Sequence, residues 1–157
     1  MVVNTTRLIE MIRSGSNVCH TTGVKTPERE SFSIFALPND FVPSHRIIYL
    51  SKNAEKFSGI DNLILDELLK QKQLKGAFDS ARSYTPFIDE KLAKYRTESH
   101  LYFHTSQDIN VSLVKLLISG NVDYIIEYPW MAKWLVETGL GMEVEFEARE
   151  IEGMKPY

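Results

Sequence analysis

The sequence predicts an α/β fold with a largely parallel sheet. Segments with the helical period of hydrophobic residues take turns with short segments rich in β-branched and aromatic residues. The 157 residues are 43% hydrophobic, which is enough for the core of one ordinary domain or of two small lobes. We find no internal repeat and no low-complexity segment in this order.

The first elements are a helix, a short strand, a β-rich segment and a second helix. Residues 4–15 (NTTRLIEMIRSG) predict a helix, because their apolar residues recur on one helical face before Gly15. Residues 17–24 (NVCHTTGV) are a strand candidate and residues 45–51 (HRIIYLS) are typical of a strand. Residues 61–76 (DNLILDELLKQKQLKG) again have the helical period.

The rest of the chain alternates strands and helices without a break. Thr85 followed by Pro86 is a typical helix start, because Thr caps the helix and Pro lacks the N–H that would be unpaired there. The expected elements are a strand at 76–81, a helix at 83–95, a strand at 99–105, a helix at 106–121, a buried strand at 122–128, a helix at 129–139 and an alternating strand at 142–151.

The bulk charge excludes some classes of partner. A net charge of −3 and a pI near 5.8, with no block of Lys or Arg, argue against nucleic acid. The apolar runs are too short or too interrupted to span a bilayer, and the first residues lack the pattern of a signal peptide. Cys19 is the only cysteine, so no internal disulfide can form.

The stretch VKTPERESF contains the first candidate for a ligand-binding residue. Thr26 and Pro27 form a helix start, which places Arg29 in the first turn. That turn already carries the positive end of the helix dipole, so a cation there is unfavourable unless an anion binds next to it. The alternative is that Arg29 pairs with Glu28 or Glu30 on the surface, which we favour from these residues alone because surface ion pairs are common.

The run TTRLIEMIRSGSNVCHTTGVKTPERESFSIFALP resembles the first-lobe signature of family 3 extracellular solute-binding proteins, which have the type II periplasmic binding-protein fold. That signature is a helix ending near a Gly, a short strand, a Thr-x-x-Arg helix start and an aromatic-Ser-x-x-Pro segment. Its counterparts are Gly15, the strand around Val18, Thr26 with Arg29, and FSIFALP. The segments HRIIYLSKN, GAFDSARSYTPFIDEKL and LLISGNVDYIIEYPWMAKWL resemble the family's crossing strand, second-lobe binding loop and Gly-x-x-Asp strand.

The resemblance spans nearly the whole chain and implies a domain organisation. Residues 1–50 would be a partial lobe one, residues 51–145 a nearly complete lobe two, and residues 146–157 the second hinge strand. Relative to the family, the chain then resembles a fragment truncated at both ends, which lacks the opening strand-helix-strand of lobe one and the returning C-terminal part. Because apolar residues of the first helix would have little to pack against, we expect a homodimer or a loosely ordered lobe one.

The resemblance also implies the site residues. In amino-acid-binding members the Thr-x-x-Arg arginine holds the α-carboxylate of the ligand, and its counterpart is Arg29, with Thr22 as a hydroxyl contact upstream. In lobe two the loop with Arg82, Ser83 and Tyr84 would receive a second anionic oxygen. Ser83 is equally compatible with an ordinary helix cap.

One position departs from the family. Its members place an acidic residue where this chain has Tyr128, and the adjacent Glu127 would face the other side of the sheet. An α-amino acid ligand is therefore in doubt, and a carboxylate, a peptide-like compound or an aromatic solute is left, with Tyr128, Tyr84 or Trp130 as a stacking surface. For Trp130 and Trp134, at helical i, i+4 spacing, we favour a place in the core.

Other chemistries have weaker support. His100 and His104 would be about 13 Å apart along a strand, too far to share a metal ion. Cys19 next to His20 is better explained as a buried structural cysteine than as a nucleophile. The sequence has no carboxylate pair, Gly-rich phosphate loop or Gly-x-Ser-x-Gly elbow, so it predicts no cofactor, no metal and no enzyme.

The leading hypothesis is a periplasmic solute-binding protein that closes two lobes around a small, carboxylate-bearing ligand and delivers it to the permease of an ABC transporter. The alternative is a ligand-sensing module with the same fold, and a less favoured one is an α/β hydrolase. The periplasmic location and the permease partner are implied by the resemblance alone.

Overall fold

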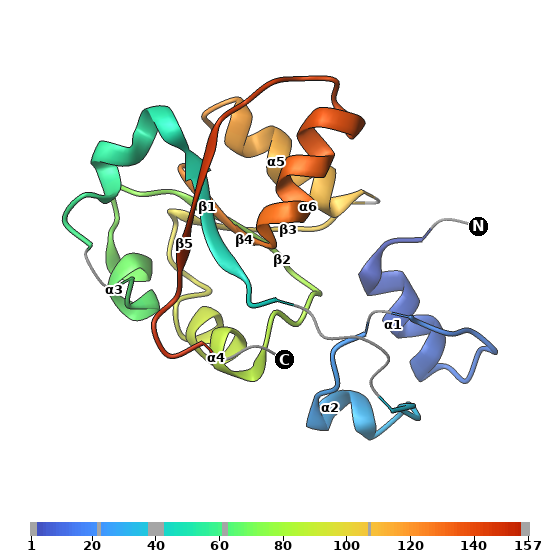
Figure 1. Ribbon diagram of the computed structural model, residues 1–157. Helices are drawn as coiled ribbons and strands as arrows, with labels where there is room; N and C mark the ends of the chain where they lie inside the picture. Colours follow the sequence, from blue (N-terminus) through green and yellow to red (C-terminus); the bar gives the residue numbers. More distant parts are fainter. Residues whose placement is uncertain (1–2, 22, 38–42, 61–62, 107, 155–157) are drawn as a thin grey trace.

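The computed structural model describes residues 3–21, 23–37, 43–60, 63–106 and 108–154. From residue 43 onward these residues form a five-stranded sheet with helices on both faces (Figure 1). The elements are α1 (Thr5–Arg13), α2 (Pro27–Glu30), β1 (Arg46–Leu50), a 3₁₀ helix (Ser51–Phe57), α3 (Leu65–Lys70), β2 (Gly76–Asp79), α4 (Pro86–Lys94), β3 (Leu101–His104), α5 (Ile109–Ile118), β4 (Tyr124–Glu127), α6 (Pro129–Trp134), a π-helical turn (Leu135–Gly139) and β5 (Phe146–Glu150).

The sheet is mixed, with strand order β3-β2-β4-β1-β5. β2 is parallel to both β3 and β4, whereas β1 is antiparallel to both of its neighbours, β4 and β5. The prediction of a largely parallel sheet therefore applies only to β2, β3 and β4. Alternation of helices and strands implies parallel pairing only where neighbours in the sheet are linked by a crossover helix, and no such helix links β1 to β4 or β5.

Two hydrophobic clusters hold the helices to the sheet. β1 shows the period of two, because Ile47 and Tyr49 belong to one cluster and Ile48 and Leu50 to the other. The first cluster packs α3 and α4 on one face, and the second packs α5, α6 and the π-helical turn on the opposite face. β4 is buried along its whole length, as the apolar run at 122–128 predicts.

The predicted elements are largely present, with one much shorter helix. Only Leu65–Lys70 of the expected helix at 61–76 is helical, and Asp61, its expected cap, lies outside the described residues. A continued helix would place Leu74 one turn beyond the exposed Lys70, on the same face. The chain turns instead, and Leu74 is buried against the first cluster.

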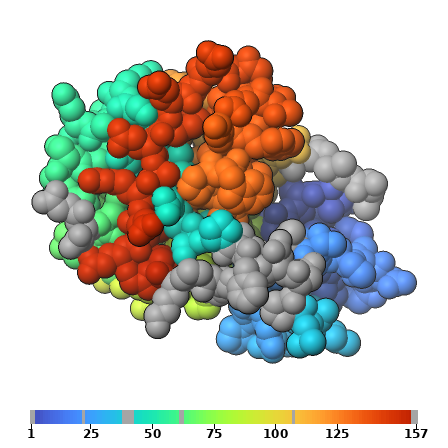
Figure 2. All heavy atoms as spheres, in the orientation of Figure 1, coloured from blue at the N-terminus to red at the C-terminus, as the bar shows by residue number. Residues whose placement is uncertain are grey.

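The N-terminal segment, residues 3–37, lies beside the sheet-bearing part (Figures 1 and 2). None of its described residues is buried, and none of the described residues from 17 to 24 is in a strand, so the strand predicted there is wrong. Among the described residues, no strand pairs with segment 17–24, so its backbone lacks the hydrogen bonds of a β-ladder. Cys19 is exposed rather than buried for the same reason, because this segment has no core of its own.

Candidate functional site

A cavity of about 370 Å³ lies between the first turn of α2 and the loop that follows β2. Its walls come from two distant parts of the sequence. Arg29 from one wall and Ala81 from the other are 52 residues apart. The lining residues are Thr26, Pro27, Glu28 and Arg29 from the N-terminal segment, and Ser80, Ala81, Arg82, Ser83, Pro86 and Asp89 from the loop and α4.

Local structure places Arg29 at this cavity. Thr26 Oγ1 accepts a hydrogen bond from the Arg29 backbone N–H at 3.2 Å, and Pro27 occupies the start of α2, as predicted. The Arg29 guanidinium donates from Nη1 to the Val24 carbonyl oxygen at 2.9 Å and from Nη2 to the Ala81 carbonyl oxygen at 3.2 Å. Arg29 therefore bridges the N-terminal segment and the loop after β2.

The acids next to Arg29 in the sequence have other partners. Glu28 forms an ion pair with Arg13 at 2.8 Å and Glu30 forms one with Lys25, also at 2.8 Å. Among the described residues, no carboxylate forms an ion pair with Arg29. Burial, and after it the charge of Arg29, lower the pKa of His20, which favours the neutral form of the imidazole. The surface pairing considered from the sequence is thus absent within the described part of the chain.

The opposite wall is shaped by its own side chains. Asp79 accepts a hydrogen bond from the Ala81 N–H at 2.9 Å, and the Asp79 N–H donates to Tyr84 Oη at 2.8 Å. The Asp89 carboxylate accepts from the Tyr84 N–H at 2.9 Å and from the Ser83 hydroxyl. These bonds fix the turn between β2 and α4 before any ligand is considered.

Behind this wall lies a buried charged cluster. Arg82 forms a bidentate ion pair with Glu127, from Nη1 to Oε2 at 2.7 Å and from Nη2 to Oε1 at 3.0 Å, and Glu127 is 1% exposed. Arg82 Nη2 also lies 3.1 Å from His45 Nε2. Burial alone would lower the pKa of Arg82, but the charge of Glu127 and its hydrogen bonds outweigh burial and raise it.

Aromatic rings surround the same cluster. The Arg82 guanidinium lies over the rings of Tyr84 and Tyr128, with 5.1 and 5.6 Å to the ring centroids. His45 stacks on Tyr128 with 4.1 Å between centroids, and Tyr128 stacks on Trp130 at 6.0 Å. Burial raises the pKa of Tyr84. These contacts place Tyr128 among the partners of Arg82 and His45.

The sequence led us to favour a place in the core for Trp130 and Trp134, and this prediction is wrong. They are 52% and 54% exposed on α6, the region that Figure 2 shows in orange on the open surface. The buried face of α6 is instead supplied by Ala132 and continues into Leu135 and Val136 of the π-helical turn. The i, i+4 pair of large aromatic residues thus marks the outer face of this helix.

The six predicted site residues have different positions. Thr22 lies outside the described residues. Arg29 lines the same cavity as Arg82 and Ser83, although it lies more than 50 residues before them in the sequence. Tyr84 is 1% exposed and lies under the loop, and Tyr128 is not in the lining among the described residues.

Three residues of this region were not singled out by sequence reasoning. Asp89 and His45 had no signal beyond their residue types. Glu127 did have one, because a carboxylate at the end of a fully buried strand requires a partner of opposite charge. That signal predicts a buried cation nearby, and Arg82 is that cation.

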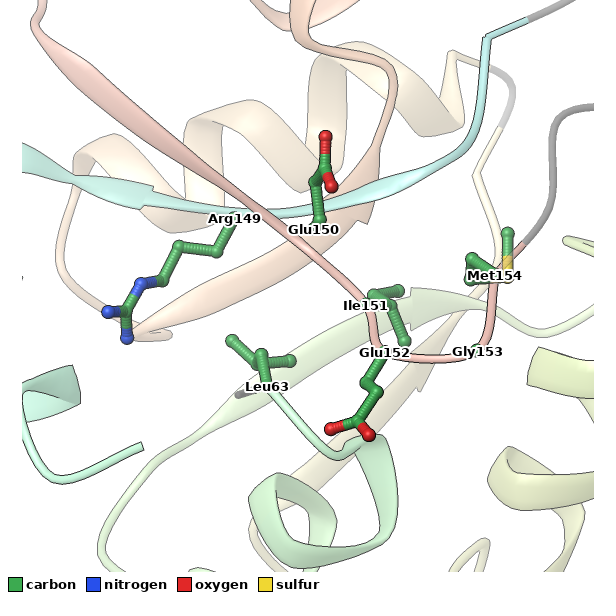
Figure 3. Close-up of a pocket in the computed structure, with 7 residues that line it drawn as sticks. All are labelled: Leu63, Arg149, Glu150, Ile151, Glu152, Gly153 and Met154. Carbon is green, nitrogen blue, oxygen red and sulfur yellow. The ribbon is translucent and has the colours of Figure 1, made fainter. Parts of the chain in front are cut away.

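A second cavity of about 360 Å³ lies where β5 ends, next to Leu63 (Figure 3). Arg149 of its lining points toward the 3₁₀ helix and donates to the carbonyl oxygens of Phe57 and Ile60, both at 2.9 Å. Glu150 pairs with Arg46 at 2.8 Å. The charged groups Arg149 and Glu150 of this cavity therefore serve contacts within the protein.

The histidine pair does not form a metal site. His100 Nε2 lies 3.0 Å from the Leu69 carbonyl oxygen, and His104 is exposed at the end of β3. Within the described ranges, no group of three or more His, Cys, Asp or Glu residues could hold a metal ion. In the same part of the chain, no helix is both long enough and apolar enough to cross a membrane.

Comparison with known proteins gives a fold. The ancestral amino acid-binding protein AncCDT-1, described as a precursor of cyclohexadienyl dehydratase, matches with a TM-score of 0.57 and 16% sequence identity over 92% of this chain. The chain spans 60% of the length of that protein. An ancestral cyclohexadienyl dehydratase matches with a TM-score of 0.44 and 13% identity, over 97% of this chain and 56% of the other. No protein-family model and no curated protein matches the sequence.

The chain has the type II periplasmic binding-protein fold. The mixed sheet with helices on both faces agrees with the match to AncCDT-1, which confirms the predicted fold class. The prediction from the sequence that the chain is not an enzyme is wrong, because it does not follow from this fold. AncCDT-1 is described as the precursor of a dehydratase, so this fold accommodates catalysis as well as binding.

Proposed function

We propose that the chain binds a small polar solute with a carboxylate in the cavity between α2 and the loop after β2. The observation that carries the proposal is Arg29, a guanidinium at that cavity with two carbonyl partners and no ion pair among the described residues. A guanidinium fork matches a carboxylate with two charge-assisted hydrogen bonds. Ser83 lies across the cavity, and because its hydroxyl already donates to Asp89, its oxygen would accept a hydrogen bond from a second polar group of the solute.

The fold neighbour supports the class of ligand. AncCDT-1 is described as amino acid-binding, and amino acids carry the carboxylate that Arg29 would bind. Together with the resemblance of the sequence to family 3 extracellular solute-binding proteins, this supports a role in the periplasm, with delivery of the solute to a membrane permease. The proposed contacts to the solute are Arg29, Thr22 and Ser83. The other residues expected from the sequence, Arg82, Tyr84 and Tyr128, would support the loop from behind.

We also propose the two-lobe organisation, with residues 1–50 as part of lobe one, residues 51–145 as lobe two and residues 146–157 as the second hinge strand. Support comes from β1 and β5, the two strands at these boundaries, which pair with each other from Arg46↔Glu150 to Leu50↔Phe146. Two adjacent strands that both leave one lobe form a hinge that bends as a unit. A solute held between Arg29 and the loop would then hold the lobes closed.

The proposal is tested by thermal unfolding of the full chain with three carboxylate probes: succinate, phenylacetate and glycylglycine. The methyl ester of phenylacetate and the dimethyl ester of succinate serve as uncharged controls. We expect at least one acid to raise the melting temperature while its ester does not, because binding to the folded state stabilises it. Equal shifts with an acid and its ester would contradict recognition of the carboxylate, and no shift with any probe at millimolar concentration would contradict the site.

A further inference from the structure

The two terminal nitrogens of the Arg82 side chain have partners inside the protein. Nη1 donates to Glu127 Oε2 at 2.7 Å and to Asn110 Oδ1 at 3.4 Å, while Nη2 donates to Glu127 Oε1 at 3.0 Å and lies 3.1 Å from His45 Nε2. The four hydrogens on Nη1 and Nη2 thus have four protein acceptors. A solute carboxylate could take this fork only by displacing Glu127, which would leave a buried carboxylate without a partner.

The backbone of Arg82 has a different position from its side chain. Its neighbours Ala81 and Ser83 both line the cavity, and the Ala81 carbonyl oxygen accepts the hydrogen bond from Arg29. The side chain reaches in the other direction, to Glu127 at the end of β4 and to His45 just before β1. Arg82 therefore ties the wall of the cavity to two strands of the sheet.

We propose that Glu127 and His45 are positioning residues, which hold the Arg82 side chain and through it fix Ala81 and Ser83 opposite Arg29. Arg82 then orients the wall of the ligand site and does not itself bind the carboxylate of the solute. The part of this inference that concerns the solute rests on the proposed function. The part that concerns the loop does not.

His45 suits this role because its ring is neutral. Burial, and after it the charge of Arg82, lower the pKa of His45 to about 3, so Nε2 can accept a hydrogen bond from Arg82 over the whole range near neutral pH. The other groups that face the ring are Glu127, through Arg82, and the phenol rings of Tyr84 and Tyr128. His45 is 3% exposed and lies one residue before β1, so it couples the loop to the strand that leads from the N-terminal segment.

The test is amide hydrogen exchange of the loop at residues 80–85, measured without any solute. The Ala81 and Tyr84 amides, bonded to Asp79 and Asp89, report on its order. In Glu127→Gln we expect these amides to exchange about tenfold faster, because the loop opens locally once Arg82 loses its anion. A second variant, Arg82→Met with Glu127→Leu, removes both charges and should fold, since apolar replacement of a buried pair is commonly tolerated.

A matched control is the exposed pair Arg46 and Glu150, whose side chains are 39% and 81% exposed. Arg46→Gln with Glu150→Gln should leave exchange at residues 80–85 unchanged. The inference is supported if the double variant of Arg82 and Glu127 speeds exchange in the loop and leaves β4 protected. It is overturned if exchange in the loop equals that of the parent, or if it rises equally throughout the sheet.

Solute binding provides an independent arm, with succinate as the probe. If the double variant loses succinate binding while exchange at residues 80–85 stays as in the parent, Arg82 contacts the solute directly and the inference is overturned. Loss of binding together with faster loop exchange supports it. If succinate does not bind the parent, succinate is excluded as a ligand of the proposed site. The exchange measurements still decide the positioning role.

Discussion

Replacement of Arg29 with Ala separates the role of this residue in folding from its role in binding. The substitution removes two charge-assisted hydrogen bonds to carbonyl oxygens, at 2.9 and 3.2 Å. Because Arg29 is partly exposed, we expect the two bonds together to contribute about 1–3 kcal/mol to the free energy of unfolding. For a chain of this length each kcal/mol corresponds to about 2–4 °C in melting temperature, so the unliganded variant should melt a few degrees below the parent.

The effect on binding should be larger and specific. A probe at 100 times its dissociation constant stabilises the parent by about 2.7 kcal/mol, which is about 5–10 °C, and this increment should vanish in Arg29→Ala. Arg29→Lys keeps the charge without the fork and should recover only part of the increment. Lys25→Ala, four residues away and paired with Glu30 on the surface, is the control and should keep the full increment.

The assay is differential scanning fluorimetry of the parent and the three variants, with the carboxylate probe that stabilises the parent most. Circular dichroism before heating verifies that each variant is folded. The reasoning is refuted if Arg29→Ala shows the same probe-induced increment as the parent. It is also refuted if Lys25→Ala loses the increment to the same extent, because the effect would then be one of general charge.

Three further predictions concern stability. Gly76→Ala should lower the free energy of unfolding by about 1–3 kcal/mol, and with it the urea midpoint, because its Cβ would lie 2.6 Å from Tyr124 Cζ. A midpoint equal to the parent's would contradict this packing. Thr85→Ala should cost about 1 kcal/mol through the lost bond to the Ile88 N–H, and an unchanged midpoint would show that the cap contributes nothing. The pKa of His45 is lowered from its ordinary value of 6.5 to about 3 in the folded state, so the folded state binds fewer protons than the unfolded state. The free energy of unfolding should therefore fall as the pH is lowered from 6.5 to 3, by up to about 1.4 kcal/mol per pH unit. His45→Phe should flatten this part of the profile, and an equally steep profile in that variant would contradict the prediction.

Much of the fold could be predicted because local patterns decide it. The cap formed by Thr85 and Pro86 and the buried run of β4 are set by residues within a few positions of each other. The direction of β1 could not be predicted, because it depends on pairing with β4, about 80 residues later, and nothing in the period of a strand encodes direction. The length of α3 was also overestimated, since the burial of Leu74 depends on the first hydrophobic cluster.

The candidate site could be predicted only in part, for a similar reason. Arg29 and Ser83 could be selected from motifs, and the cavity does bring their positions together. The partner of Arg82 could not, because Glu127 is 45 residues away and strand alternation placed its side chain on the other side of the sheet from Tyr128, whereas Arg82 contacts both. Charge pairing between distant segments is a property of the folded chain.

The last prediction concerns the N-terminal segment, residues 3–37. Within its described residues none is buried, and Ile34 and Leu37 are 101% and 90% exposed, whereas every residue of β4 is buried. The free energy of local opening follows the number of buried apolar contacts, so the amides of α1 should exchange with solvent much faster than those of β4. Leu8, Ile9, Met11 and Ile12 are only partly covered, and this is the face through which we propose that two copies associate.

Hydrogen exchange at low and high protein concentration, combined with light scattering, tests both statements. At low concentration we expect a monomer in which α1 exchanges fast and β4 slowly. As concentration rises, protection of α1 should increase together with the mass, because association covers the apolar face of this helix. Protection of α1 equal to that of β4 in a dilute monomer would show that the segment needs no partner. A rise in mass with no added protection of α1 would place the contact between copies on another surface.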